Sequence, residues 1–124
     1  MNDSWIEEFC LSLTGAVKEY KPEWEALLYR VGGKMFVMQG QDNEGRSIIT
    51  VKLEPPFGEM LRSQFDDIRP GYYMNKLHWN SVDLNGSVPD ELLKNMLDQS
   101  YNLVLHSLPK KTQQAIVSGS NKEG

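Results

Sequence analysis

The sequence predicts an α+β fold, a two-layer sandwich in which helices cover one face of an antiparallel sheet. Two observations predict it. Apolar residues recur with helical spacing near the start, in the middle and near the end of the chain, whereas the segments between them alternate as strands do. Short turn signals such as Gly32-Gly33 join neighbouring strands, and strands joined so closely must be antiparallel. The expected order is a helix, three or four strands, a second helix, two strands and a third helix.

The first half of the chain is expected to form one helix and most of the sheet. Ile6, Phe9, Cys10 and Leu13 follow the i, i+3, i+4, i+7 spacing of a single helix face, and Gly15 ends this helix. Turn residues then separate short extended segments that are rich in apolar and β-branched side chains. Strands are expected at residues 16–20, 26–31, 35–39 and 47–53.

The second half is expected to add two helices, two strands and a tail. Pro56 can open a short helix that ends near residue 65, and strands are expected at 72–75 and 77–84. Pro89 lies in the first turn of the longest helix, and Pro109 ends it. Residues 112–124 are polar and rich in Gly and Ser, which predicts a disordered tail. The chain is therefore expected to be a single domain over residues 1–111, followed by that tail.

Composition narrows the class of protein. A chain of 124 residues with 40% hydrophobic and 24% charged residues suits one globular domain. Its one cysteine excludes an internal disulfide, and two histidines without clustered carboxylates predict no metal site. No cofactor is expected. There is no apolar run near the roughly 18 residues of a membrane span, and no signal-type N-terminus. We expect a monomeric, cytoplasmic bacterial protein with no membrane partner.

The charge is acidic overall but unevenly distributed. A formal net charge of −4 argues against attraction of nucleic acid to the whole surface. Residues 1–67 hold 12 acidic residues against 7 Lys and Arg, whereas residues 68–124 hold 5 against 6. A local basic face is therefore compatible with the acidic total.

The segment 69–81 gathers the side chains that most resemble a recognition site: two phenols, an indole, an imidazole, a lysine and two amides. If its second part is a strand, His78 and Asn80 share one side, opposite Leu77 and Trp79. Trp79 is then expected in the core. Lys52 lies opposite the apolar residues of its own strand in the same way.

The polar sides of these strands, if they coincide, form one basic surface that can hold phosphates while tyrosine rings stack on bases. The alternative is an ordinary solvated face of an antiparallel sheet. The candidate nucleic-acid or ligand-binding residues are Arg30, Lys34, Lys52, Tyr72, Tyr73, Asn75, Lys76, His78 and Asn80.

Catalytic chemistry is not predicted. Cys10 lies on the apolar stripe of the first helix and Ser100 lies inside the last one, and neither has a plausible base nearby in the sequence. Gly32-Gly33-Lys34 lacks the pattern of a phosphate-binding loop and is read as a hairpin. The protein is therefore expected not to be an enzyme.

Several motifs together resemble one family. Pro70-Gly71-Tyr72-Tyr73-Met74-Asn75-Lys76 is followed by His78-Trp79-Asn80, Val88-Pro89 and Ser100-Tyr101, with Gly33-Lys34-Met35-Phe36, Val51-Lys52 and Leu108-Pro109-Lys110-Lys111 around them. In this combination the chain resembles the MmcQ/YjbR family over roughly residues 4–111. The resemblance implies a CyaY-like, secretion-chaperone-like sandwich and carries over no catalytic residue.

The resemblance also implies a function, since members of that family carry the label DNA-binding protein. The expectation is a small non-enzymatic binding protein that contacts DNA weakly and without sequence preference. Likeness to secretion chaperones gives a second hypothesis, a protein-interaction adaptor. The polar segment 75–80 gives a third, a small-ligand binder.

Overall fold

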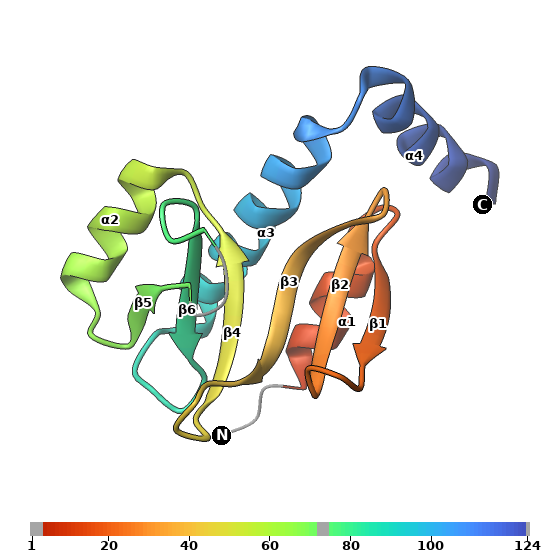
Figure 1. The fold of residues 1–124 in the computed structure, drawn as a ribbon. Coiled ribbons are helices and arrows are strands. Elements are labelled where there is room, and N and C mark those ends of the chain that lie inside the picture. Colours follow the sequence, from red (N-terminus) through yellow and green to blue (C-terminus); the bar gives the residue numbers. More distant parts are fainter. Residues whose placement is uncertain (1–3, 72–74, 124) are drawn as a thin grey trace.

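A computed structural model describes residues 4–71 and 75–123 (Figure 1). Its elements are α1 (Trp5–Ser12), β1 (Val17–Lys21), β2 (Ala26–Val31), β3 (Lys34–Gln41), β4 (Ser47–Lys52), α2 (Pro55–Gln64), β5 (Ile68–Pro70), β6 (Trp79–Asp83), α3 (Asp90–Ser107) and α4 (Lys110–Glu123). The six strands form one antiparallel sheet in the order β1-β2-β3-β4-β6-β5. The predicted α+β class and element order are confirmed, with one helix more than expected.

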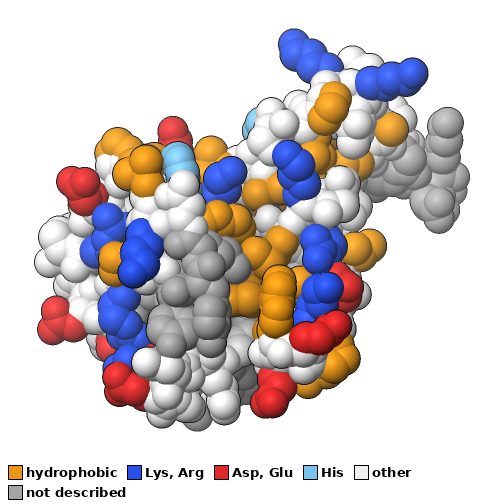
Figure 2. Space-filling view, in the orientation of Figure 1, with side chains coloured by type: hydrophobic (Ala, Val, Ile, Leu, Met, Phe, Trp, Pro, Cys, Tyr) orange, Lys and Arg blue, Asp and Glu red, His pale blue; other side chains and the backbone are white. Residues whose placement is uncertain are grey.

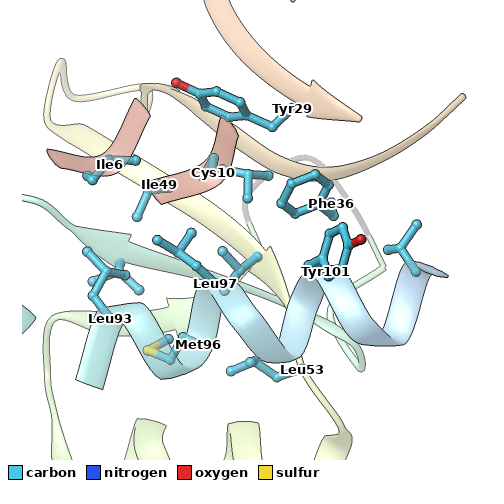
Figure 3. Packing of buried hydrophobic residues seen from close by; sticks show 14 of the residues in the cluster. Ile6, Cys10, Tyr29, Phe36, Ile49, Leu53, Leu93, Met96, Leu97 and Tyr101 are labelled. Atoms are coloured by element: carbon cyan, nitrogen blue, oxygen red, sulfur yellow. The ribbon is translucent and has the colours of Figure 1, made fainter. Parts of the chain in front are cut away.

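The core lies between the sheet and the first three helices (Figure 1). Ile6 and Cys10 enter it from α1, as their helical spacing predicts, and α3 contributes a long buried stripe. The ring of Phe36 on β3 meets that of Tyr101 on α3 edge to face, with centroids 5.4 Å apart (Figure 3). α1, α2 and α3 therefore pack on one face of the sheet and leave the other uncovered by helices; we call the latter the open face.

A bulge in β3 sets which side chains reach the open face. The β2–β3 register shifts between Tyr29 and Arg30, so that Tyr29 pairs with Val37 and Arg30 with Met35. The extra residue is Phe36, and both it and Val37 lie in the core. The irregularity adds one large aromatic residue to the core while Arg30 and Met35 stay on the other side.

The hydroxyl of Ser100 ties α3 to the sheet beside this bulge. Ser100 Oγ donates to the carbonyl oxygen of Phe36 at 2.5 Å and accepts the backbone N–H of Lys52 at 2.8 Å. It thus satisfies one group on β3 and one on β4, at the point where the ladder between these strands ends at Val37–Val51. Ser100 is fully buried, and its side chain makes both of these hydrogen bonds in the interior.

The last two strands differ from their predicted positions. β5 lies at Ile68–Pro70, before the Pro70-Gly71 turn and not after it, and β6 begins at Trp79. Pro70 is tolerated because β5 is an edge strand. Gly71 donates to the carbonyl of Trp79 at 2.6 Å, and a Cβ on Gly71 would come within 2.8 Å of the Cβ of Trp79. Of the predicted strand 72–75, residues 72–74 lie outside the described residues, and Asn75 begins a turn.

The face assignment in β6 is wrong in the sequence analysis. Asn80 is fully buried on the helix side and pairs with Val51, while Trp79 is half-buried on the open face beside Lys52. Leu77, expected on the same side as Trp79, is 59% exposed. Arg62 of α2 donates to Asn80 Oδ1 and satisfies this buried amide.

The predicted disordered tail also differs from the structure, which has α4 over these residues. Ile116 is partly buried against the core. Its side chain lies directly against two glycines. A Cβ on Gly15 would come within 2.7 Å of Ile116 Cγ2, and a Cβ on Gly32 would come within 3.3 Å of Ile116 Cδ1. Two glycines at positive φ therefore leave room for a side chain that follows them by more than eighty positions.

We predict that Ser100→Ala lowers the free energy of unfolding by about 1–3 kcal/mol, because it leaves a backbone donor and an acceptor without a partner in the interior. Urea denaturation measures the loss. Ser107→Ala is the control, since its hydroxyl donates only to Val104 within the same helix, and we expect a change below about 0.5 kcal/mol. Equal losses in the two variants would contradict the bridging role.

We predict that Ile116→Ala destabilises the protein by about 1–2 kcal/mol, or roughly 3–8 °C in melting temperature, because a half-buried side chain loses its packing against the body. Thermal denaturation followed by circular dichroism measures the shift. Val117→Ala removes apolar atoms from a side chain that is 52% exposed and should leave the melting temperature unchanged. An unshifted Ile116 variant would mean that α4 does not pack on the body.

Candidate functional site

The open face combines a buried centre with charged margins. Ala26, Leu28 and Met38 form a small apolar cluster of buried residues on it, with Met35 packed against them. Figure 2 views the molecule from this side and shows hydrophobic side chains over the middle of the sheet with Lys and Arg near its borders. The open face therefore differs from a plain solvated sheet, because it has a buried apolar centre and charged margins.

Cationic residues gather at one end of the sheet, Arg30 and Lys52 on the open face and Lys34 at the tip of the β2–β3 hairpin, where it pairs with the buried Val31. Antiparallel pairing brings the ends of β2 and β4 and the start of β3 together, and with them Arg30, Lys34 and Lys52. The turn that precedes β6 adds Lys76 and His78, because the carbonyl of His78 accepts the N–H of Leu53 at 2.8 Å, one residue beyond β4. We call Arg30, Lys34, Lys52, Lys76 and His78 the basic end.

The start of α4 extends the basic end. A Cβ on Gly32 would come within 2.5 Å of Leu108 Cδ1, so the chain enters α4 against the β2–β3 hairpin. Lys110 and Lys111 then begin α4 at this end of the sheet (Figure 1). Two lysines from the last helix thus add to those that the strands supply.

The cations of the basic end differ in how far they are neutralised. Arg30 Nε donates to Glu19 Oε1 at 2.6 Å and thereby holds the pKa of Glu19 below its usual range. Among the side chains described in residues 4–71 and 75–118, no carboxylate forms an ion pair with Lys34, Lys52 or Lys76, nor with the two lysines that open α4. These lysines leave a local positive charge on a protein of net charge −4.

Two predicted site residues have structural roles instead. Asn80 is fully buried beneath α2, where a Cβ on Gly58 would come within 3.0 Å of its Nδ2 atom. Asn75 Oδ1 accepts the N–H of Leu77 at 2.8 Å and stabilises the turn before β6. Tyr72 and Tyr73 lie outside the described residues. The structure thus brings together five of the nine candidates.

Trp79 is the residue that sequence reasoning misplaced. It pairs with Lys52 across β4 and β6, so the indole and the side chain of Lys52 share the open face at the basic end. A signal for this was present, because Val82 and Leu84 have the same parity as Asn80 and both are buried. Counting back from these two aliphatic residues places Trp79 on the opposite side, whereas counting from Leu77 places it in the core, so the local pattern fits both assignments.

Cys10 and Ser100 are buried residues whose side chains serve the fold. Burial raises the pKa of the Cys10 thiol to about 12, which keeps it protonated, and both hydrogen bonds of the Ser100 hydroxyl are made to backbone groups. Within residues 4–71 and 75–123 there is no group of three His, Cys, Asp or Glu side chains placed to hold a metal ion. Over the same ranges, none of the helices has the length and apolar character needed to cross a membrane.

Comparison with known proteins gives relatives over almost the whole chain. The family model described as YjbR matches residues 11–103. The Escherichia coli K12 protein YjbR is 32% identical over 117 residues, which cover 94% of this chain and 98% of that protein. The crystal structure of Deinococcus radiodurans protein DR2400 is 30% identical, covers 90% of this chain and 84% of its own, and superposes with a TM-score of 0.80. A Pseudomonas syringae protein that is 22% identical shares the fold, with a TM-score of 0.71 over 84% of this chain and 99% of its own.

We predict that Cys10 reacts slowly with iodoacetamide in the folded protein, because a thiol with a raised pKa holds almost no thiolate near neutral pH. Mass spectrometry measures the rate of alkylation at pH 8. The unfolded chain in urea is the control and should react many times faster, since its thiol returns to a pKa of about 8.5. Rapid labelling of the native protein would show that the thiol is accessible and ionised.

Proposed function

This chain belongs to the YjbR family, and we propose that it is a non-enzymatic protein that binds DNA, weakly and without sequence preference, through the basic end of its sheet. The observation that carries the proposal is the cluster of lysines there for which the described side chains supply no carboxylate partner. A lysine that is not neutralised by its own protein can replace the counterions of a phosphate and release them to solution. We also propose that the protein is a monomer and is located in the bacterial cytoplasm.

The side chains at the basic end suit phosphates better than bases. Lys34, Lys52 and Lys76 offer mobile point charges, and contacts of this kind fix position on the duplex without reading sequence. The buried amide of Asn80 and the turn-forming amide of Asn75 are engaged within the protein, so they do not offer the paired hydrogen bonds that identify adenine. Specificity for sequence is therefore not expected.

Trp79 adds a second kind of contact. Trp79 lies beside Lys52 on the open face and is only half-buried. An indole next to a phosphate-binding lysine can stack on an unpaired base, and such stacking tolerates every base. We therefore expect single-stranded DNA to bind at least as well as the duplex.

The test is a titration of a fluorescein-labelled DNA duplex at two or more salt concentrations, followed by anisotropy. Lys52→Ala together with Lys76→Ala should weaken binding of all sequences about equally. The slope of log affinity against log salt should fall by roughly 2, because each lost phosphate contact removes close to one released counterion.

The matched control is Lys18→Ala together with Lys94→Ala. It changes the net charge by the same amount, but these lysines lie on the helix side of the sheet, where they pair with Glu7 and Glu91. It should leave the salt slope unchanged. If the two double variants weaken binding equally, binding depends on net charge and not on the basic end. If no binding is detected at low salt with high-micromolar protein, the DNA proposal is wrong.

A further inference from the structure

A second surface runs from Met35, beside Arg30 of the basic end, to the opposite end of the sheet. An apolar groove of about 570 Å³ opens there on the open face. Its described walls are Glu23, Trp24, Ala26, Met35, Met38, Gly40, Gln41 and Ile48. Two methionines and an isoleucine give it a floor that adapts to different apolar side chains, since thioether chains are unbranched and polarizable.

An acidic hollow adjoins this groove around the end of the sheet, on the helix side, where Leu27, Gln39 and Leu84 line it. It has a volume of about 580 Å³ and shares Glu23, Trp24, Gly40 and Gln41 with the apolar groove. Its other described walls include Glu25 and Asp42. Asp42 is already neutralised, because Arg46 Nε lies 2.7 Å and Arg69 Nη2 3.8 Å from its carboxylate. Within the described side chains, Glu23 and Glu25 form no ion pair and remain as uncompensated negative charges.

Trp24 stands between the two hollows. Its side chain is 56% exposed, although an indole is among the largest apolar groups that a protein can bury. The β1–β2 turn holds it there through the bonds from Trp24 N to Lys21 O and from Glu25 N to Pro22 O, at 3.1 and 3.2 Å. The indole already attracts a cation, since Lys21 Nζ lies 5.5 Å from its ring centroid.

We propose that these two hollows form one binding site for a segment of a partner protein that carries a large apolar side chain next to Lys or Arg. The apolar side chain occupies the groove over Met35, Met38 and Ile48. The cation lies against Glu23 and Glu25 and over the free face of the Trp24 ring. Exposed tryptophans bordered by such pockets are typical of the residues that dominate protein interfaces.

Charge complementarity selects this partner over others. Nucleic acid and acidic segments are repelled by Glu23 and Glu25, and an apolar segment without a cation leaves these two carboxylates unpaired. A basic segment is also directed away from the lysines at the opposite end of the sheet. The Trp24 site therefore does not compete with DNA for the same residues.

Two short acetylated peptides serve as probes. In the first, leucine alternates with lysine; in the second, leucine alternates with glutamate. Each is titrated into the ¹⁵N-labelled protein. The lysine peptide should shift the amide resonances of Trp24, Met38 and Gly40, and bind at least about tenfold more tightly than the glutamate peptide.

Variants locate the two parts of the site. Trp24→Ala should lower the affinity for the lysine peptide at least about tenfold, because the indole borders both the groove for leucine and the hollow for lysine. Glu23→Gln together with Glu25→Gln should abolish the preference for lysine over glutamate. Glu59→Gln together with Asp98→Asn removes the same charge from exposed positions on α2 and α3 and should leave both affinities unchanged.

Three results would overturn the proposal. Equal affinity for the two peptides would show that the surface binds apolar side chains without preferring a neighbouring cation. Shifts confined to other residues, or none at millimolar peptide, would place no site at Trp24. Shifts at Trp24 that grow with protein concentration alone would assign the surface to a second copy of this chain. Lys52→Ala with Lys76→Ala should leave peptide binding intact, so failure of the DNA proposal and failure of this one are separate outcomes.

Discussion

The hydroxyl of Ser100 is the contact on which the arrangement of the functional end of this sheet depends. It joins three elements that are far apart in sequence, since it donates to Phe36 in β3, accepts from Lys52 in β4 and belongs to α3. The bulge at Phe36 ends the regular pairing of β3 with β4 and leaves these two backbone groups without partners in the ladder. A serine in the middle of a helix supplies a donor and an acceptor in one small side chain, which no aliphatic residue could do. The backbone positions of Lys52 and of the hairpin that carries Lys34 follow from this junction.

The sheet has opposite charge at its two ends, although the total charge gives no sign of this. Antiparallel pairing places Lys34 and Lys52 at one end and the β1–β2 turn with Glu23 and Glu25 at the other. Between them lies an apolar strip, and Thr50 and Ser81 bond to each other there at 2.8 Å, so that neither hydroxyl needs water. A single sheet can therefore present an anion-binding end and a cation-binding end without a second domain. The two proposed activities draw on separate residues for that reason.

Buried polar contacts and close approaches fix α2 and α4 in this fold. Arg62 satisfies the amide of Asn80 under α2, and Gly58 allows the helix to approach it. On the other side of the molecule, Gly15 and Gly32 leave space for Ile116 of α4. Each contact joins a residue of one element to a glycine or an amide in another, and none of them produces a periodic pattern in the sequence.

The sequence alone determined the element order, the antiparallel pairing and most of the core. Helical spacing identified Ile6 and Cys10, and alternation over residues 47–53 identified Ile49, Val51 and Leu53 as core residues, because burial in a single regular segment follows its own period. It also indicated that Arg30 and Lys52 face away from the core. These are properties of one segment at a time, so they can be read without knowing the neighbours.

Only the tertiary structure decided which side of β6 is buried, where the fifth strand lies and whether the C-terminal segment packs. In β6 both parities carry apolar residues, Leu77 and Trp79 on one and Val82 and Leu84 on the other. The choice between them was made by Arg62 of α2, which provides a buried partner for Asn80 and so permits the indole to remain on the open face. For α4, the decisive apolar contact is a single isoleucine received by two distant glycines. Contacts of this kind depend on what another element supplies in space, and that information is absent from the local pattern of the chain.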